Sequence, residues 1–418
     1  MNVAAEQRLV VLEEQCAKPE WLSLEDAALL IQLRFDVVCL ASSDTTGEHP
    51  GQAQFLINPK QYVSHLALPS GTLLIVRPKI DPSQVFRLLA YVYAGWNKDV
   101  FRQVEVSYSS DNLLFEPLIE LFNELIAARV RRGLVQDYVR HEDNLSVMRG
   151  RIQFERHIAL NAMRPDRLFC RYHHQTVDNE DNQILKWTLR LLASVNGWSS
   201  RTVHSLRVNL RHFSEVSLRA PDRVGLGDRV YHRMNDDYRL LHDLCRLFLD
   251  GGAIDEHTGD WRFRGFLLDM NRLFEAFVSK AFEAVAGRLT NLTAHPQKAE
   301  LLCQAKSGTV WIQPDVTICE GSRAIVIVDA KYKRPEGGPI NPDLYQMIAY
   351  GTALQCNRAF LLYPATESAL EETFEIRHSP ITVHVRHIDI GHEECVPRAE
   401  RVAEMILQEI ASEMRALG

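Results

Sequence analysis

Apolar residues recur along the chain in helical and in alternating patterns, and these patterns predict the order of its elements. Ser23 is a plausible N-cap for a first helix, and runs broken by proline and glycine predict a small β unit after it. Further helical patterns follow, interrupted by an irregular, basic stretch over 141–176. The predicted helices span 22–36, 83–96, 112–140, 180–196, 201–218 and 234–249, and the predicted strands lie within 53–80.

The last third of the chain predicts a mixed sheet. A long helical pattern closed by Gly287 is followed by three strand candidates, a helix behind the N-cap candidate Asn341, two more strand candidates and an amphipathic helix. Their ranges are 262–286, 297–304, 309–319, 323–331, 342–355, 358–363, 381–388 and 397–417. The order α-β-β-β-α-β is typical of a mixed sheet flanked by helices.

Together these elements predict an α/β protein in three consecutive parts. Residues 1–128 form an N-terminal α+β adaptor region, residues 129–255 a basic and mainly helical middle region, and residues 256–418 a C-terminal mixed-sheet domain. A Gly-rich stretch places the main boundary at about 250–260.

Composition and cysteine spacing narrow the class of protein. The 418 residues are 46% hydrophobic, which is sufficient for more than one buried core. The eight cysteines include no CxxC pair and no zinc-type cluster, so we expect reduced thiols rather than a disulfide framework. The first residues lack a secretory pattern and no run approaches about 18 apolar residues, so a cytoplasmic protein is expected.

The net charge of −7 is distributed unevenly along the chain. Residues 1–128 hold 9 Lys and Arg against 16 Asp and Glu, whereas residues 129–233 hold 19 against 11, and 18 of those 19 cations are arginines. Arginine makes bidentate phosphate contacts, so the middle segment permits DNA binding, although solvated helix faces explain the same charges equally well. The acidic N-terminal part suits docking to a protein better than to DNA.

Candidate chemistry gathers at the end of one predicted strand. In SRAIVIVDAKYK, alternation places Asp329 and Lys331 on the same face, with their Cα atoms about 6.6 Å apart. Asp315 follows Pro314 in the preceding strand candidate and can lie beside Asp329 if the two strands form a hairpin. A structural ion pair at a strand end is the alternative interpretation, but the combination of Pro-Asp, a spacer of 13 residues and Asp-x-Lys after an apolar strand favours a functional site.

Two neighbouring carboxylates repel each other, and a divalent cation removes that repulsion. Mg²⁺ prefers one or two carboxylates together with water and phosphate oxygens. Lys331 would then position the attacking water or neutralise charge in the transition state. The residues therefore predict metal-assisted phosphodiester hydrolysis.

Two predicted helices offer further candidates. Glu275 lies about 100° from the centre of the apolar face of its helix, which favours it as an additional carboxylate, with a surface ion pair as the alternative. Gln346 and Tyr350 are spaced i, i+4 and share a helix face, from which they could hydrogen-bond a phosphate or orient the lysine. An ordinary helix can also carry such a pair by chance.

These residues together resemble a known signature. Pro314-Asp315 followed by Asp329-Ala330-Lys331 resembles the PD-(D/E)xK nuclease motif, and Glu275, Gln346 and Tyr350 match its helix glutamate and Q-x-x-x-Y positions. The sequence around these residues is similar to that of the McrC family, whose members are the nuclease subunits of McrBC modification-dependent restriction systems. The strings that carry this resemblance are MNRLFEAFV, QPDVTI, VDAKYK and DLYQMIAYG, and the resemblance covers about residues 50–365.

The resemblance implies a restriction-endonuclease-like fold for residues 256–418 and a Mg²⁺-dependent DNA endonuclease, with Asp315, Asp329 and Glu275 as metal ligands. It also implies a division of labour, in which an McrB-like AAA+ GTPase hexamer carries the reader of modified cytosine and is stimulated by this subunit. The sequence is consistent with this division of labour, because it contains no G-x-x-x-x-G-K-[ST] nucleotide-binding loop. Nucleotide hydrolysis would therefore be carried out by another chain. Double-strand cleavage needs two active sites, so self-association through the nuclease domains is expected.

Two other functions remain open at this point. The chain could be a non-catalytic activator whose nuclease fold serves only as a scaffold for the ring. It could also be a PD-(D/E)xK nuclease paired with a different motor, which reads something other than methylcytosine in double-stranded DNA. Base contacts cannot be inferred from a basic segment, because phosphate contacts carry no sequence information.

Overall fold

The protein is described by a computed structural model that divides into two compact units. Unit 1 comprises residues 1–114 and 266–418, and unit 2 comprises residues 115–265. The described residues are 8–41, 49–94, 115–195, 197–221, 229, 231, 235–257, 260–289, 291–305, 308–333, 341–365 and 370–417. This partition differs from the three consecutive parts expected above, because the N-terminal and C-terminal segments share one unit and unit 2 is inserted between them.

The N-terminal part of unit 1 consists of two small sheets and two helices. Its elements are β1 (Leu9–Glu13), β2 (Lys18–Leu22), α1 (Leu24–Gln32), β3 (Asp36–Ala41), β4 (Ala53–Asn58), β5 (Tyr62–Ala67), β6 (Leu73–Arg77) and α2 (Pro82–Ala94). The predicted first helix is confirmed with its capping box, because Ser23 Oγ accepts a hydrogen bond from the N–H of Asp26 at 3.1 Å. One sheet has the order β2-β4-β3, and in the other β6 lies between β1 and β5.

The C-terminal part of unit 1 contains a six-stranded sheet of order β12-β15-β16-β17-β19-β18. Its elements are α9 (Met270–Ala286), β12 (Leu292–Pro296), β13 (Glu300–Ala305), β14 (Gly308–Ile312), β15 (Val316–Glu320), β16 (Arg323–Ala330), α10 (Asn341–Leu354), β17 (Arg358–Pro364), β18 (Glu372–Glu375), β19 (Thr382–Ile388) and α11 (Cys395–Leu417). Strand β16 is antiparallel to β15 and parallel to β17, and β17 is parallel to β19. The predicted mixed sheet is thereby confirmed.

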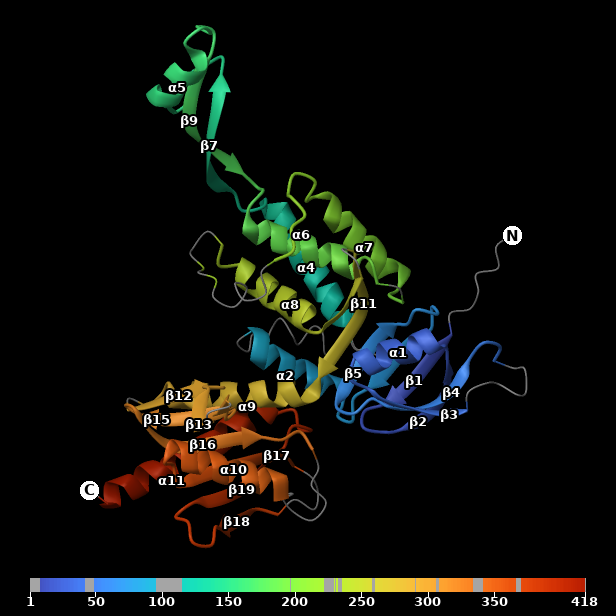
Figure 1. Ribbon diagram of the computed structural model, residues 1–418, viewed down its shortest axis with the longest axis vertical. Helices are drawn as coiled ribbons and strands as arrows, with labels where there is room; N and C mark the ends of the chain where they lie inside the picture. The colour runs from blue at the N-terminus through green and yellow to red at the C-terminus, as the bar shows by residue number, and fades with distance from the viewer. Residues whose placement is uncertain are drawn as a thin grey trace. The chain divides into compact units, whose positions relative to one another are not determined.

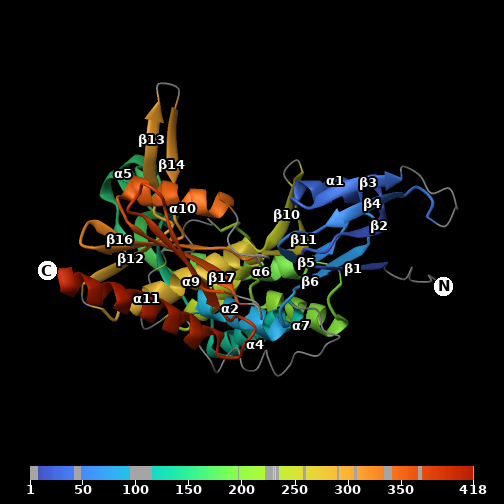
Figure 2. The same ribbon diagram turned by 90° about the horizontal axis from the view of Figure 1, so that it is seen from below.

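Helices cover both faces of this sheet. Figure 2 shows α10 on one side of the strands and α9 with α11 on the other. On the α10 side, Ile327, Leu361 and Val383 from three neighbouring strands pack in one core cluster with Met347 of α10. The strands are short and almost wholly apolar because both of their faces are covered.

Two predicted element boundaries in this region are wrong. The helix predicted from residue 262 begins at Met270, because Asp269 caps it by accepting from the N–H of Asn271 at 3.0 Å, and β11 (Asp260–Asp269) occupies the preceding residues. The strand predicted over 309–319 is split between β14 and β15, because Pro314 cannot donate a ladder hydrogen bond.

Unit 2 combines a helical group with a small sheet. Its elements before β11 are α4 (Glu116–Arg132), β7 (Asp137–Leu145), β8 (Arg151–Ile152), α5 (Phe154–Asn161), β9 (Leu168–Thr176), α6 (Glu180–Leu192), α7 (Ser200–Arg211), α8 (Tyr238–Asp250) and β10 (Gly252–His257). Within this unit, β7, β9 and α5 extend away from the four longer helices (Figure 1). We call residues 137–176 the arm.

Two sequence predictions for the residues in and just before the arm are wrong. The helix predicted over 112–140 ends at Arg132, and the next residue, Gly133, has φ of 89°. Residues 141–176 are not irregular, since β9 pairs antiparallel with both β7 and β8. Strand β7 is exposed along most of its length and so lacks the apolar alternation that would have revealed it.

Among the helices that the structure describes, none combines the length and the apolar character that a membrane span requires.

Candidate active site

The β15–β16 hairpin brings Asp315 beside Asp329. Val316 pairs with Val328 in this antiparallel ladder, so the residue before β15 lies next to the C-terminal end of β16. The carboxylate of Asp315 accepts a hydrogen bond from the backbone N–H of Ala330 at 2.7 Å. Asp315 is 8% exposed and Asp329 is 1% exposed, so both carboxylates are withdrawn from bulk solvent.

Lys331 contacts Asp329 directly. Its Nζ lies 2.7 Å from Oδ2 of Asp329, and its side chain is 23% exposed. The backbone N–H of Lys331 donates to the carbonyl of Leu362 at 2.8 Å, which extends the pairing of β16 with β17 by one residue. The lysine is therefore held directly after the C-terminal end of β16, partly exposed and in contact with a buried carboxylate.

Burial and the neighbouring charges shift the pKa values of the groups at this site. Burial is the largest cause that raises the pKa of Asp315 well above the ordinary range of a carboxyl group, and the charge of Asp329 is the second. Burial also raises the pKa of Asp329, against the opposing effect of Lys331. Burial acts to lower the pKa of Lys331, but the charges of Asp329 and Asp315 outweigh it and raise that pKa. An added cation would relieve the repulsion between the two carboxylates.

Glu275 approaches this pair from α9. Burial raises the pKa of Glu275, the charge of Lys331 lowers it and that of Asp329 raises it, so its carboxylate lies within electrostatic reach of both. Across the part of the chain that the structure describes, no three or more His, Cys, Asp or Glu side chains are grouped so that they could hold a metal ion together. Asp315 and Asp329 thus form the close carboxylate pair, with Glu275 at its margin.

Gln346 and Tyr350 do share a face of α10, as their spacing predicts. Gln346 Nε2 donates to the hydroxyl of Tyr350 at 2.6 Å, and that hydroxyl donates to the carbonyl of Gln313 at 3.2 Å. Gln313 directly precedes Pro314-Asp315, so the tyrosine holds the turn that presents Asp315. Burial, followed by the charge of Asp329, raises the pKa of Tyr350.

The residues present fit a hard divalent cation. Two carboxylates supply the number of protein oxygens that Mg²⁺ usually takes. Burial, the largest cause, raises the pKa of each, and a bound cation would favour their ionised forms. The pair also lies where β16 ends beside the parallel strand β17, and the carboxyl ends of parallel strands are a common position for ligands.

Sequence reasoning missed a second buried carboxylate group beside the first. Asp343, in the first turn of α10, is 5% exposed and binds Lys333 and the hydroxyl of Tyr363. The available signal was weak, because an acidic residue in the first turn of a helix is common for reasons of the helix dipole alone.

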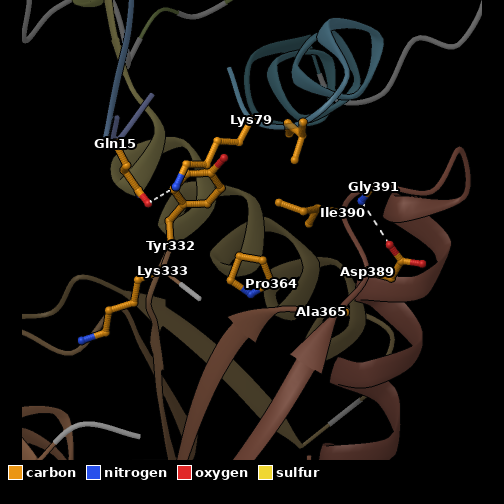
Figure 3. Close-up of a pocket in the computed structure, with 10 residues that line it drawn as sticks. Gln15, Lys79, Tyr332, Lys333, Pro364, Ala365, Asp389, Ile390 and Gly391 are labelled. Atoms are coloured by element: carbon orange, nitrogen blue, oxygen red, sulfur yellow. Dashed lines mark hydrogen bonds between the residues drawn. The ribbon is translucent and has the colours of Figure 1, made fainter. Parts of the chain in front are cut away.

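A small pocket of about 80 Å³ opens where the chain leaves β16 (Figure 3). Tyr332 forms part of its wall, together with Lys79, which donates to the side chain of Gln15. The hydroxyl of Tyr332 donates to the buried carboxylate of Glu14 at 3.3 Å. The segment after Lys331 is therefore joined directly to the N-terminal part of unit 1.

Part of the Arg-rich charge of the middle region is neutralised within the arm. Arg140, Arg156 and Arg171 converge on Glu142, with N–O distances of 3.0, 2.7 and 2.7 Å. These hydrogen bonds, with that from Arg140 the largest contribution, lower the pKa of Glu142 below its ordinary value. Three guanidinium groups share one carboxylate, so this surface keeps an excess of positive charge.

Comparison with known proteins places these residues in a family. A model of the family described as McrBC 5-methylcytosine restriction system component matches residues 57–364. The type IV methyl-directed restriction enzyme EcoKMcrBC of Escherichia coli K12 is 23% identical over 330 residues, covering 72% of this chain and 90% of that protein.

A solved structure shares the fold. It is a half-complex from a tetradecameric assembly of Thermococcus gammatolerans McrB AAA+ hexamers with bound McrC, and the match has a TM-score of 0.60 at 17% identity. The match covers 95% of this chain and 100% of that chain. Because the family model spans well over half of the sequence, the chain belongs to the family of McrBC 5-methylcytosine restriction system components.

Proposed function

We propose that this protein is the DNA endonuclease subunit of a methylcytosine-dependent restriction complex, and that it cuts DNA by Mg²⁺-dependent phosphodiester hydrolysis. The observation that carries the proposal is the buried pair of Asp315 and Asp329 with Lys331 2.7 Å from the second carboxylate. On this proposal the six-stranded sheet is a restriction-endonuclease-like core, and its signature is the PD-(D/E)xK motif that the sequence resembles.

Each residue of the site has a distinct role in this mechanism. Asp315 and Asp329 would hold the metal, which supplies positive charge that polarises the scissile phosphate when it is bound. Lys331 orients the attacking water and neutralises the negative charge that develops on the phosphate oxygens. Its position at the rim of the pair, partly exposed, leaves it accessible to DNA.

Three further residues support this arrangement. Glu275 adds a carboxylate within electrostatic reach of Lys331 and Asp329, and it would contribute negative charge to the site that holds the metal. Tyr350 holds the turn before Asp315, and Gln346 holds the tyrosine. We therefore assign Tyr350 and Gln346 a positioning role, since both groups already contact the protein rather than open solvent.

We further propose that an AAA+ GTPase hexamer is the partner, in keeping with the assembly of the structurally similar Thermococcus protein. The arm offers a surface for it, because exposed apolar side chains gather there: Val147, Met148, Phe154, Ile158, Leu160 and Met163. Phe154 is 69% exposed and Met163 is 92% exposed, and exposed apolar patches often mark sites of interaction with another protein. Docking there would stimulate the GTPase of the ring.

The remaining partners follow from the same scheme. The substrate is double-stranded DNA with modified cytosine, and two copies of the nuclease domain associate so that both strands are cut. The protein acts in the cytoplasm. On this view the reader of the modified base belongs to the ring, which is why base-specific contacts are not assigned to this chain.

Cleavage by the full-length protein tests the proposal. The chain is combined with its AAA+ partner, GTP and methylated plasmid DNA, and Mg²⁺ is then replaced by EDTA or by Ca²⁺. We expect double-strand cleavage only with Mg²⁺, and expect Asp329→Asn to remove it while GTP hydrolysis continues. Stimulated GTP hydrolysis with no cleavage by the unaltered protein would instead identify a non-catalytic activator.

A further inference from the structure

Asp343 joins three elements around the candidate active site. Its Oδ1 accepts from Lys333 Nζ at 2.9 Å, its Oδ2 lies 2.7 Å from the same nitrogen, and Oδ2 also accepts from the hydroxyl of Tyr363 at 2.6 Å. Lys333 follows β16, Asp343 lies in the first turn of α10 and Tyr363 lies near the C-terminal end of β17. Asp343 and Tyr363 are both buried, so these contacts are not exchanged readily for contacts with water.

The contact between Asp343 and Lys333 restrains the direction that the backbone takes after Lys331. The N–H of Lys331 donates to the carbonyl of Leu362, and the N–H of Lys333 donates back to the carbonyl of Lys331 at 2.9 Å. The chain therefore bends immediately after the lysine of the site. Holding Lys333 on Asp343 fixes the far side of that bend and with it the direction in which Lys331 departs from the sheet.

The same helix holds the other strand of the site. Tyr350 lies seven residues after Asp343, which is about two helical turns, so the two side chains share a face of α10. Tyr350 binds the carbonyl of Gln313 before Asp315, and Asp343 binds Lys333 after Lys331. Helix α10 thus contacts the chain next to each of the two catalytic segments.

We propose that Asp343 is a positioning residue of the nuclease, acting through Lys333 and Tyr363 to keep Lys331 against Asp329. This inference rests on the proposed function. Net stabilisation alone explains the group poorly, because replacing a buried ion pair with apolar residues is often neutral for stability. A displacement of about 1 Å at a reacting group, by contrast, can lower a rate by about 100-fold.

An electrostatic role for Asp343 is the competing explanation. Burial has the largest effect on the pKa of Asp329 and Lys331 the next largest, and the smaller effects of the charges of Asp343 and Lys333 have opposite directions. Because the two charges oppose each other at Asp329, removing both together changes the local field less than removing either one. A charge-balanced double variant therefore separates geometry from electrostatics.

The experiment compares Asp343→Asn, Lys333→Met and the double variant in the full-length protein with its AAA+ partner. We expect each to lower the single-turnover cleavage rate by about 10- to 100-fold, with the apparent KM for DNA and the half-saturating Mg²⁺ concentration within about threefold of the unaltered protein. The double variant should be no slower than the slower single variant, because both changes break one contact. Tyr363→Phe should lower the rate less, since the contact with Lys333 remains.

A matched control lies in the same unit. Glu400 also accepts from a tyrosine, Tyr91 at 3.0 Å, and from a cation, Arg288 at 2.7 Å. The double variant Glu400→Gln/Arg288→Met removes the same kinds of group away from the proposed site and should leave the cleavage rate unchanged. Thermal unfolding with and without Mg²⁺ is recorded for every variant, so that a loss of folded protein is measured separately from a loss of rate.

Three results would overturn the inference. They are an unchanged rate in the Asp343 and Lys333 variants, a rate loss that only follows the unfolded fraction, and a shifted Mg²⁺ requirement in the single variants that the double variant restores. In each of these cases the unaltered protein still cleaves DNA, so the proposed function stands. Absence of Mg²⁺-dependent cleavage by the unaltered protein would remove both the proposed function and this inference.

Discussion

The carboxylate of Asp315 accepts a hydrogen bond of 2.7 Å from the backbone N–H of Ala330, the residue between the aspartate and the lysine of the D-x-K motif. This single contact joins the two motif segments across the β15–β16 hairpin. It also leaves the carboxylates of Asp315 and Asp329 buried next to each other. A bound cation would relieve the repulsion between these two carboxylates.

The repulsion predicts how stability depends on pH. Burial and the charge of Asp329 raise the pKa of Asp315 in the folded protein, so the folded state binds more protons than the unfolded state above the ordinary carboxyl pKa of about 3.9. Stability without metal should therefore fall as pH rises from that value through the raised pKa. Asp315→Asn should flatten this dependence, as measured by urea unfolding at a series of pH values.

Added Mg²⁺ provides the matching control for this prediction. It should stabilise the unaltered protein more at high pH, where both carboxylates are ionised, and should have little effect on Asp315→Asn. A pH dependence that is the same in the two proteins would show that Asp315 is not the group responsible.

Tyr350 is expected to matter mainly for the rate of cleavage. Tyr350→Phe removes the hydroxyl that donates to the carbonyl of Gln313 and accepts a hydrogen bond from the side chain of Gln346. This loss should lower the free energy of unfolding by about 1 kcal/mol. We expect cleavage to slow by about tenfold because the turn before Asp315 is released. Tyr345→Phe is the control, since that residue is exposed on the same helix, and equal losses in the two variants would contradict the assignment.

The close packing of α10 on the sheet can be tested at Gly351. A Cβ at this position would lie 2.8 Å from the carbonyl oxygen of Cys356 and 2.9 Å from Cδ1 of Ile381. Gly351→Ala should therefore destabilise the protein by about 1–3 kcal/mol, although alanine is the better helix former. Gly308→Ala, where a Cβ meets nothing within 4 Å, should leave the urea midpoint nearly unchanged.

The exposed apolar surface of the arm predicts where the partner binds. Phe154→Asp and Ile158→Asp add charge at exposed positions of α5 and should weaken association with the AAA+ partner by at least about tenfold without changing the unfolding midpoint. Leu24→Asp makes the same change at an exposed residue of α1, in the acidic region first expected to dock the partner. If only Leu24→Asp loses binding, the partner docks on residues 1–128 and not on the arm.

Strong local patterns made much of the C-terminal part predictable. The apolar run of β16 ends at the buried Asp329, and the turn around Gly321 predicts the hairpin that places Asp315 beside it. The spacing of Gln346 and Tyr350 likewise correctly predicted a shared face, because helical geometry alone determines it. These features depend on residues that are close together in the sequence.

The features that the sequence did not reveal depend on distant contacts or weak patterns. Glu14 and Tyr332 meet across more than 300 residues, and no local pattern indicates that the two ends of the chain share a unit. The contact between Lys333 and Asp343 spans residues 334–340, which lie outside the described part of the chain. The start of α9 was misplaced because the apolar residues of β11 continue the helical pattern backwards past the cap Asp269.

The most direct test of the account is the cleavage activity of Lys331→Ala in the complete complex with the AAA+ partner, GTP, Mg²⁺ and methylated DNA. Cleavage and GTP hydrolysis are measured in the same reactions, and circular dichroism establishes that the variant is folded. The proposed mechanism predicts a cleavage rate at least about 1,000-fold lower with GTP hydrolysis still stimulated, because Lys331 orients the attacking water and neutralises charge on the phosphate but has no part in GTP hydrolysis. Cleavage retained within about tenfold of the unaltered protein would contradict it.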